Sequence, residues 1–308
     1  MRTRALTAVA ALAAVLACGG CGLGPGSPTK GVSLTVTGGF GARHVSTVSR
    51  TKVPGSETVM RMLERSFKIS TRYGGGFVES INGLAPSGGH TDWFYYVNGV
   101  QASKGAAATA VHAGDHIWWD LHDWSVTENI PAVVGSFPEP FTSGIAGKRY
   151  PVTLECGTDV DAACKQATKA LTAQHIPASS QLLGTGSGTE TLGIVVGTWN
   201  EIRSQVGAAL IAHGPSASGV YARFTGSGGA ALQLLDPSGH VVRTLGEGAG
   251  PIAATAGQSS VPTWMVTGND PAGVLAAARA LTPQALHDHF ALAVDGASHV
   301  PVPVPAAR

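Results

Sequence analysis

Four side chains capable of chemistry alternate with apolar residues in one short segment. They are His116, Trp118, Asp120 and His122. Side chains two residues apart in a β-strand point to the same face, so we expect these four on one face and the apolar residues between them in the core. Two imidazoles, an indole and a carboxylate on one face predict an open platform on which a ring-bearing ligand stacks, with His116 or His122 donating hydrogen bonds. The alternative is a solvated outer face that carries one incidental tryptophan.

A second aromatic segment, residues 93–97, precedes the first in a chain whose aromatic content is only 6%. Either face of this strand-like segment could point inward, so Tyr95 and Tyr96 are both candidates for contact with a ligand. The pairs Asn98-Gly99 and Gly114-Asp115 are typical of tight turns, because both positions tolerate positive φ. We therefore interpret these pairs as structural.

Metal binding and catalysis have weaker support in these residues. His116, Asp120 and His122 could converge on an ion, but zinc sets usually combine tighter spacing with a distant ligand, so we expect no metal. The sequence contains no Gly-x-Ser-x-Gly, Walker or His-Glu-x-x-His motif. We therefore expect that the protein is not an enzyme. The separation of paired carboxylates is set by tertiary structure, which leaves an envelope hydrolase as a third hypothesis.

The start of the chain has the pattern of an export signal. A basic beginning is followed by an apolar run over residues 5–17 that is too short to span a bilayer. The run ends at Cys18 in a sequence that resembles a bacterial lipobox, which implies cleavage before Cys18 and lipid attachment to its thiol. Cys21 is the competing site, and an ordinary secretory peptide is the alternative. Residues 1–17 are thus expected to be a signal peptide, and the Gly- and Pro-containing residues 18–30 a flexible tether.

Composition agrees with a place outside the cytoplasm, on the outer face of the cell membrane. Charged residues make up 13% of the chain and the net charge is +1, which argues against a nucleic-acid partner. The other two cysteines, Cys156 and Cys164, are expected to form a disulfide in an oxidising compartment. The loop that they close is short, so we expect this disulfide to be a local link that adds little to the stability of the whole chain.

The first half of the chain shows the element order of a β-grasp fold. Strand-like patterns at residues 32–37 and 44–49 precede a helical pattern over residues 57–67, with Ser56 as the expected N-cap. Further strand-like segments follow at residues 77–83, 93–97 and 116–121. Two strands, a helix and then further strands predict an α+β domain of the β-grasp type.

The helix at residues 58–63 and the segments 76–83, 93–99 and 114–119 together resemble the DUF4430, or transcobalamin-C-terminal-like, domain. The resemblance covers about residues 31–124. In cobalamin carriers the similar domain holds one side of the corrinoid, so the resemblance implies a ligand-binding domain and makes a cobalamin-like ring one candidate ligand. The α/α-barrel of those carriers has no counterpart in this sequence, and we expect no other cofactor.

The second half alternates strand and helix signals. Residues 125–150 lose periodicity and are expected to be a linker, followed by an α/β domain over residues 151–308. An apolar run at residues 191–198 predicts a strand buried on both faces, and helices are expected at residues 161–174, 201–213 and 272–281. Two polar turns, at residues 197–200 and 267–270, follow apolar strands, where open α/β sheets bind ligands. The Pro-rich end is expected to be extended and solvated.

These patterns together predict a lipid-anchored extracytoplasmic protein that binds a ligand without catalysis. The ligand would be a ring-bearing small molecule held by the DUF4430-like domain. The alternative is a structural or accessory envelope protein that binds other proteins.

Overall fold

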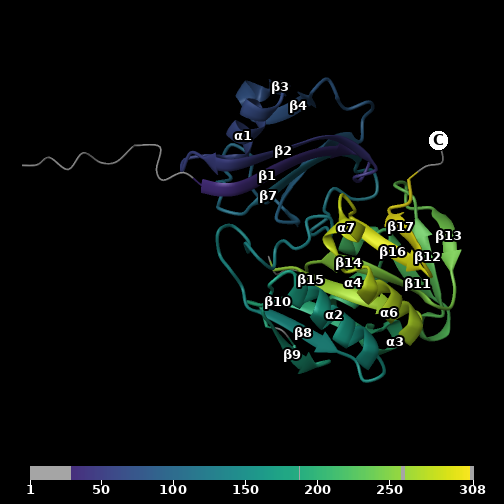
Figure 1. Ribbon diagram of the computed structural model, residues 1–308. Coiled ribbons are helices and arrows are strands. Elements are labelled where there is room, and N and C mark those ends of the chain that lie inside the picture. Colours follow the sequence, from purple (N-terminus) through teal and green to yellow (C-terminus); the bar gives the residue numbers. More distant parts are fainter. Residues whose placement is uncertain (1–28, 187, 258–260, 306–308) are drawn as a thin grey trace, which may run out of the picture.

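The computed structural model describes residues 29–186, 188–257 and 261–305. The predicted lipidation site, Cys18 or Cys21, and most of the predicted tether lie outside these ranges. The described chain is a mixed α/β structure in which an N-terminal sheet and a C-terminal sheet pack against each other (Figure 1). In this part of the chain no helix has both the length and the apolar character needed to span a bilayer.

The N-terminal sheet has the strand order β2-β1-β7-β5-β6 in the described residues. Its strands are β1 (Thr29–Gly38), β2 (Arg43–Val53), β5 (Thr91–Val97), β6 (Val100–Gln101) and β7 (His116–Asp123). The central pair β1 and β7 is parallel, whereas β2 and β5 are antiparallel to their neighbours. The first and last long strands therefore meet at the middle of the sheet, and β7 is held on both edges.

One face of this sheet is covered by helix α1 (Val59–Ser66) and the hairpin of β3 (Ile69–Arg72) and β4 (Phe77–Ile81), which a short 3-10 turn, η1 (Tyr73–Gly75), connects (Figure 1). The N-cap of α1 is Thr58, whose hydroxyl accepts a hydrogen bond from the backbone N–H of Arg61, so the expected Ser56 cap is wrong by two residues. Ile117 and Trp119 point into the core beneath α1, as the alternation along β7 predicts.

The C-terminal sheet has the order β17-β16-β14-β15-β10-β8-β9 in the described residues. Its strands are β8 (Val152–Cys156), β9 (Ala178–Leu182), β10 (Leu192–Thr198), β14 (Ala249–Thr255), β15 (Thr263–Gly268), β16 (Ala291–Asp295) and β17 (Ser298–Val302). Strands β9, β8, β10 and β15 are parallel, and the remaining pairs are antiparallel. Every residue of β10 is buried, as the continuous apolar run predicts.

Helices α2 (Asp161–Ala173) and α6 (Pro271–Arg279) cover one face of this sheet, where they pack on alternate residues of β8, β10 and β15. The other face carries α3 (Trp199–Ile202), α4 (Val206–Ala212), α5 (Pro215–Ser218) and a small antiparallel sheet. That sheet contains β11 (Ala222–Thr225), β12 (Ala231–Leu235) and β13 (Val241–Leu245), with a 3-10 turn, η2 (Ser227–Gly229), after β11. The last short helix, α7 (Pro283–Leu286), lies toward the N-terminal sheet (Figure 1).

Two expectations for the C-terminal half are wrong. The helix expected over residues 201–213 is divided into α3 and α4. A capping box of Thr198 and Glu201 begins α3 two residues early, the helix ends at Ile202, and the extended Gln205 is the N-cap of α4. The Pro-rich end is not a solvated tail. Pro301 and Val302 belong to β17 on the sheet edge, and Val302 and the following Pro303 are buried. An edge strand tolerates proline because one side needs no ladder hydrogen bonds.

The disulfide is confirmed, since Cys156 at the end of β8 is bonded to Cys164 in α2 with a Cα–Cα distance of 6.0 Å. The bridge fixes the first turn of α2 to the sheet. It is therefore a local link within the C-terminal half.

The segment between the two sheets, residues 125–150, is not a loose connector. Ile130 and Val133 belong to the same buried cluster as Trp118 of β7 and Val195 of β10, whereas Phe137 and Phe141 pack on Trp264. The backbone N–H of Val134 also donates a hydrogen bond to the carbonyl of Phe290 at 3.1 Å. One apolar core thus runs from the N-terminal sheet through this segment to the C-terminal sheet.

The contact between the halves predicts a large effect from one added methyl group. A Cβ on Gly135 would lie 2.7 Å from the backbone nitrogen of His289 and 2.8 Å from Trp118 Cζ3. Gly135→Ala should therefore lower the free energy of unfolding by about 1–3 kcal/mol through overpacking, as measured by urea denaturation. Gly105→Ala is the matched control, because nothing lies within 4 Å of its Cβ. Equal midpoints for the two variants would contradict a close-packed junction.

Candidate functional site

The predicted platform residues of β7 do share one face, but that face is covered. Trp118 and Asp120 are 0% exposed and His122 is 1% exposed. The predicted open platform is therefore wrong, as is the alternative of a solvated outer face. The physical reason is that the C-terminal half packs over this face, which a sequence pattern within one strand cannot show.

Phe290, just before β16, is the side chain at the centre of this cover. Its ring centroid lies 5.2 Å from that of Trp118, 5.4 Å from that of Tyr96 and 5.3 Å from that of His122, in edge-to-face arrangements. Phe40 and Phe94 each stack on His122, with ring centroids 4.5 Å apart. Such aromatic pairs contribute free energy beyond the area that they bury. Phe94, Tyr96 and Trp118, on one face of β5 and β7, thus form the seam between the halves.

The carboxylate of Asp120 is the polar centre of the same seam. It accepts hydrogen bonds from the hydroxyl of Thr37 at 2.5 Å, from the backbone N–H groups of Phe40 and Gly41 at 3.0 and 2.9 Å, and pairs with His122 Nδ1 at 2.9 Å. The indole N–H of Trp118 donates to Thr37 at 2.7 Å. A buried carboxylate is stable only with such partners. Asp120 is therefore occupied in holding the loop after β1.

The two tyrosines of β5 lie on opposite faces. The Tyr95 ring stacks on Trp119 at 4.8 Å, and its hydroxyl donates to the carbonyl of Lys104 and is hydrogen-bonded to Thr109. Tyr96 is 0% exposed, and burial first, with the charges of Asp120 and Tyr221, raises the pKa of its hydroxyl well above the usual value. Tyr96 therefore offers no free face to a ligand, whereas Tyr95 is only half-buried and has one ring face against Trp119.

His116 belongs to a chain of polar contacts that crosses β1 and β2. Its Nδ1 is hydrogen-bonded to Ser136 at 2.9 Å and its Nε2 to Thr35 at 3.2 Å. From Thr35 the contacts continue through Thr47 to His44, whose Nδ1 lies 2.9 Å from the carboxylate of Asp288. Sequence reasoning did not find this pair, because its members are 244 residues apart and no local motif marks either one.

The histidines near Asp288 do not make a metal site. His287 Nδ1 lies 3.3 Å from the same carboxylate, and the His44 and His287 rings are 6.5 Å apart. Within residues 29–186, 188–257 and 261–305, no group of three or more His, Cys, Asp or Glu side chains has an arrangement that could hold a metal ion.

A large cavity in the described part of the chain is a groove beside the edge of the N-terminal sheet, with a volume of about 1040 Å³. We call it the junction groove. Its walls come from β5 and β6, the loop after β6, the segment between the sheets, and residues 256 and 257 after β14. Its apolar lining includes Phe94, Val97, Val100, Pro131, Ile145 and Tyr150, and its polar lining includes Gln101, Lys104, His112 and Glu128.

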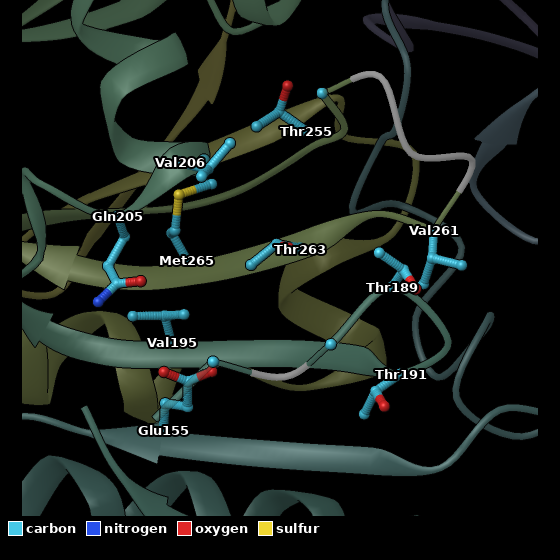
Figure 2. Close-up of a pocket in the computed structure, with 14 residues that line it drawn as sticks. Glu155, Thr189, Thr191, Val195, Gln205, Val206, Thr255, Val261, Thr263 and Met265 are labelled. Carbon is cyan, nitrogen blue, oxygen red and sulfur yellow. The ribbon is translucent and has the colours of Figure 1, made fainter. Parts of the chain in front are cut away.

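A second cavity of about 350 Å³ lies on the face of the C-terminal sheet that carries α4 (Figure 2). We call it the sheet pocket. Val195 and Met265 form an apolar floor, and the start of α4 and the loop before β10 form walls. Gly257 lines both cavities, so the two adjoin. Glu155 of β8 also lines the sheet pocket, although no motif in the sequence marks it as a site residue.

The two turns in which a ligand was expected are used for helix capping. Glu201 accepts hydrogen bonds from the backbone N–H and the hydroxyl of Thr198 at 2.8 and 2.9 Å. Asp270 accepts from the backbone N–H groups of Gly248 and Gly273, each at 2.8 Å. Both carboxylates are thus engaged by the protein, and the sheet pocket lies away from these turns, toward Thr191 and Thr263 at the starts of β10 and β15.

The imidazole of His116 predicts a loss of stability in acid. Burial first lowers the pKa of His116 to about 4; nearby Asp288 opposes this shift, and nearby His287 adds to it. In the unfolded chain the pKa of this histidine is about 6.5, so between pH 6.5 and pH 4 the unfolded chain binds a proton that the folded chain does not bind. The free energy of unfolding should therefore fall by about 2–3 kcal/mol as the pH is lowered through this range. Burial also lowers the pKa of His289, which adds in the same direction.

Urea denaturation at pH 7, 5 and 4 measures this dependence. His116→Gln should flatten the pH profile. His240→Gln, at a side chain that is 79% exposed, should leave it unchanged. A profile that is the same in both variants would show that His116 is not responsible.

Part of the chain matches a known protein family. Residues 56–123 match the family model described as "Domain of unknown function (DUF4430)". The match runs from α1 to β7 and begins after β2, so it covers part of the stretch in which the resemblance was predicted. No match was found among curated proteins. The resemblance to DUF4430 domains is confirmed for the segment that carries the aromatic strands.

Proposed function

We propose that this chain is a lipid-anchored extracytoplasmic protein that binds a ring-bearing small molecule in the junction groove and performs no reaction on it. The observation that carries the proposal is the groove itself. Its volume of about 1040 Å³ is at the upper end of the range for small-molecule sites, and it is lined by residues of the DUF4430-matched segment together with residues from the rest of the chain.

The lining of the groove suits a large, flat ligand. Phe94 and Tyr150 supply partly exposed aromatic surface, and Val97, Pro131 and Ile145 supply aliphatic surface. The ammonium of Lys148 lies 4.7 Å from the centre of the Tyr150 ring, which orients that ring by a cation–π contact. Lys104, Gln101 and Glu128 place both donors and acceptors at the rim. A cobalamin-like ring is one candidate of suitable size and chemistry.

The proposed organisation has a β-grasp domain over residues 31–124, a linker over residues 125–150 and an α/β domain over residues 151–308. The parallel pairing of β1 with β7 at the centre of the N-terminal sheet, with α1 on one face, supports the β-grasp assignment. The parallel strands β9, β8, β10 and β15, covered by helices, support the α/β assignment.

A groove-filling variant tests the binding site. Ala108 is exposed and lines the groove, so Ala108→Trp should occupy it without disturbing the core. The neighbouring Ala107 is exposed and outside the lining, which makes Ala107→Trp a matched control. Using cyanocobalamin, haemin and riboflavin as probes in equilibrium dialysis with the full chain, we expect binding of at least one probe, about tenfold weaker in Ala108→Trp and unchanged in Ala107→Trp.

Two results would overturn the proposal. The first is that none of the three probes binds at concentrations up to about 1 mM, which corresponds to about 4 kcal/mol of binding free energy. The second is that the two tryptophan variants bind equally well.

The anchor is tested separately by labelling with a fatty-acid analogue in a bacterial host that processes lipoproteins. Cys18→Ser should abolish the label on this chain, whereas Cys21→Ser should retain it, because only the thiol at the cleavage site accepts the lipid. Loss of the label in Cys21→Ser alone would move the anchor to the competing site. If the wild-type chain takes up no label, the proposed lipid anchor is wrong.

A further inference from the structure

Glu155 is a buried carboxylate on the face of the C-terminal sheet that lines the sheet pocket. It follows Leu154 on β8, and because alternate residues of a strand point to opposite faces, Leu154 enters the core under α2 and α6 while Glu155 points the other way. In the strand register it lies beside Val195, which forms the pocket floor. Only 2% of Glu155 is exposed.

This carboxylate has few partners in the described part of the chain. It accepts one hydrogen bond, a long one of 3.3 Å from the backbone N–H of Gly184, and makes no ion pair with the described residues. By contrast, Asp120 accepts several hydrogen bonds in its buried setting. A buried charge without a counter-charge is costly, so a position like that of Glu155 favours a cationic partner.

The remaining lining of the pocket supplies no cation. Among the described residues that line the pocket, Glu155 is the only charged one, and residues 178–191, which include the loop before β10, contain no Lys, Arg or His. Figure 2 shows the carboxylate beside Val195, with Gln205 on the other side of that residue and Thr189 and Thr191 farther along the pocket. The pocket therefore has one negative group next to hydroxyl groups and an apolar floor.

The helix over the pocket leaves room for an apolar ligand body. Gly207, near the start of α4, faces the floor, and a Cβ at this position would lie 3.1 Å from the sulfur of Met265. Val206 beside it is 74% exposed at the rim. The volume of about 350 Å³ is at the lower end of the range for small-molecule sites.

From these features we infer that the sheet pocket binds a small organic amine in its protonated form, with the ammonium on Glu155 and an apolar body over Val195 and Met265. Three ammonium N–H groups can donate to the carboxylate and to hydroxyl or amide oxygens of the rim. A metal ion fits less well, because calcium requires six to eight oxygen ligands and this pocket offers one carboxylate beside apolar walls. The inference does not depend on a ligand in the junction groove.

Matched probes test the charge requirement. Phenethylamine and cyclohexylamine are the amines, and 2-phenylethanol and cyclohexanol are neutral molecules of nearly the same shape. In isothermal titration of the full chain at pH 7 we expect each amine to bind with a dissociation constant below about 1 mM and at least about tenfold more tightly than its alcohol.

Variants locate the binding. Glu155→Gln removes the charge at constant shape and should weaken the amines by at least about tenfold, with no effect on the alcohols. Glu190→Gln makes the same chemical change at a side chain that is 70% exposed and outside the lining, and should bind like the wild type. Should Glu155→Gln fail to fold, Val206→Trp at the exposed rim should block amines and alcohols alike.

Three outcomes would overturn the inference. They are equal affinity for amines and alcohols, unchanged amine affinity in Glu155→Gln, and unchanged amine affinity in Val206→Trp. Ala108→Trp, which fills the junction groove, should leave amine binding intact, so failure at one cavity is distinguishable from failure at the other.

Discussion

The burial of the Asp120 carboxylate is the constraint on which the junction of this molecule depends. Its hydrogen bonds fix Thr37 and the backbone of Phe40 and Gly41, so the loop after β1 has one conformation. That conformation places the Phe40 ring against His122 and Phe290. Since burying this charge would be costly without these hydrogen bonds, polar pairing and aromatic packing are two parts of one arrangement. This arrangement joins β7 of the N-terminal sheet to Phe290 of the C-terminal half.

Local patterns predicted much of the secondary structure. The alternation along β7 assigned Ile117 and Trp119 to the core, and the continuous apolar run from Leu192 to Thr198 identified a strand buried on both faces. Both succeed because side-chain burial in a strand follows the backbone geometry alone. The motif residues of the aromatic strands also predicted the family match. The disulfide followed from cysteine count and compartment.

The site could not be predicted in the same way. The face of Trp118 was correctly separated from the core face of β7, yet its cover comes from Phe290, which is distant in sequence and has no signal of its own. Glu155 occupies a strand position whose neighbours are apolar, and only the pairing of β8 with β10 places it in a cavity. Whether a distant part of the chain covers a strand face, and which strands line the same cavity, are properties of the tertiary structure. Periodicity within one segment cannot report them.

The segment between the sheets has a consequence for how this protein can be divided. It contributes Ile130 and Val133 to one apolar cluster and Phe137 and Phe141 to another. Division of the chain within this segment would therefore expose buried apolar surface. Truncation after β7 would place the indole of Trp118 and the ring of Tyr96 in water, and each large buried side chain contributes about 1.5–3 kcal/mol to folding. An isolated DUF4430 segment would then expose an aromatic surface that promotes aggregation. Measurements on such fragments would describe the aggregates and not the native fold. A piece that keeps the native surroundings of that segment must include β17, because Val300 and Val302 belong to the same buried cluster as Trp118 and Tyr96.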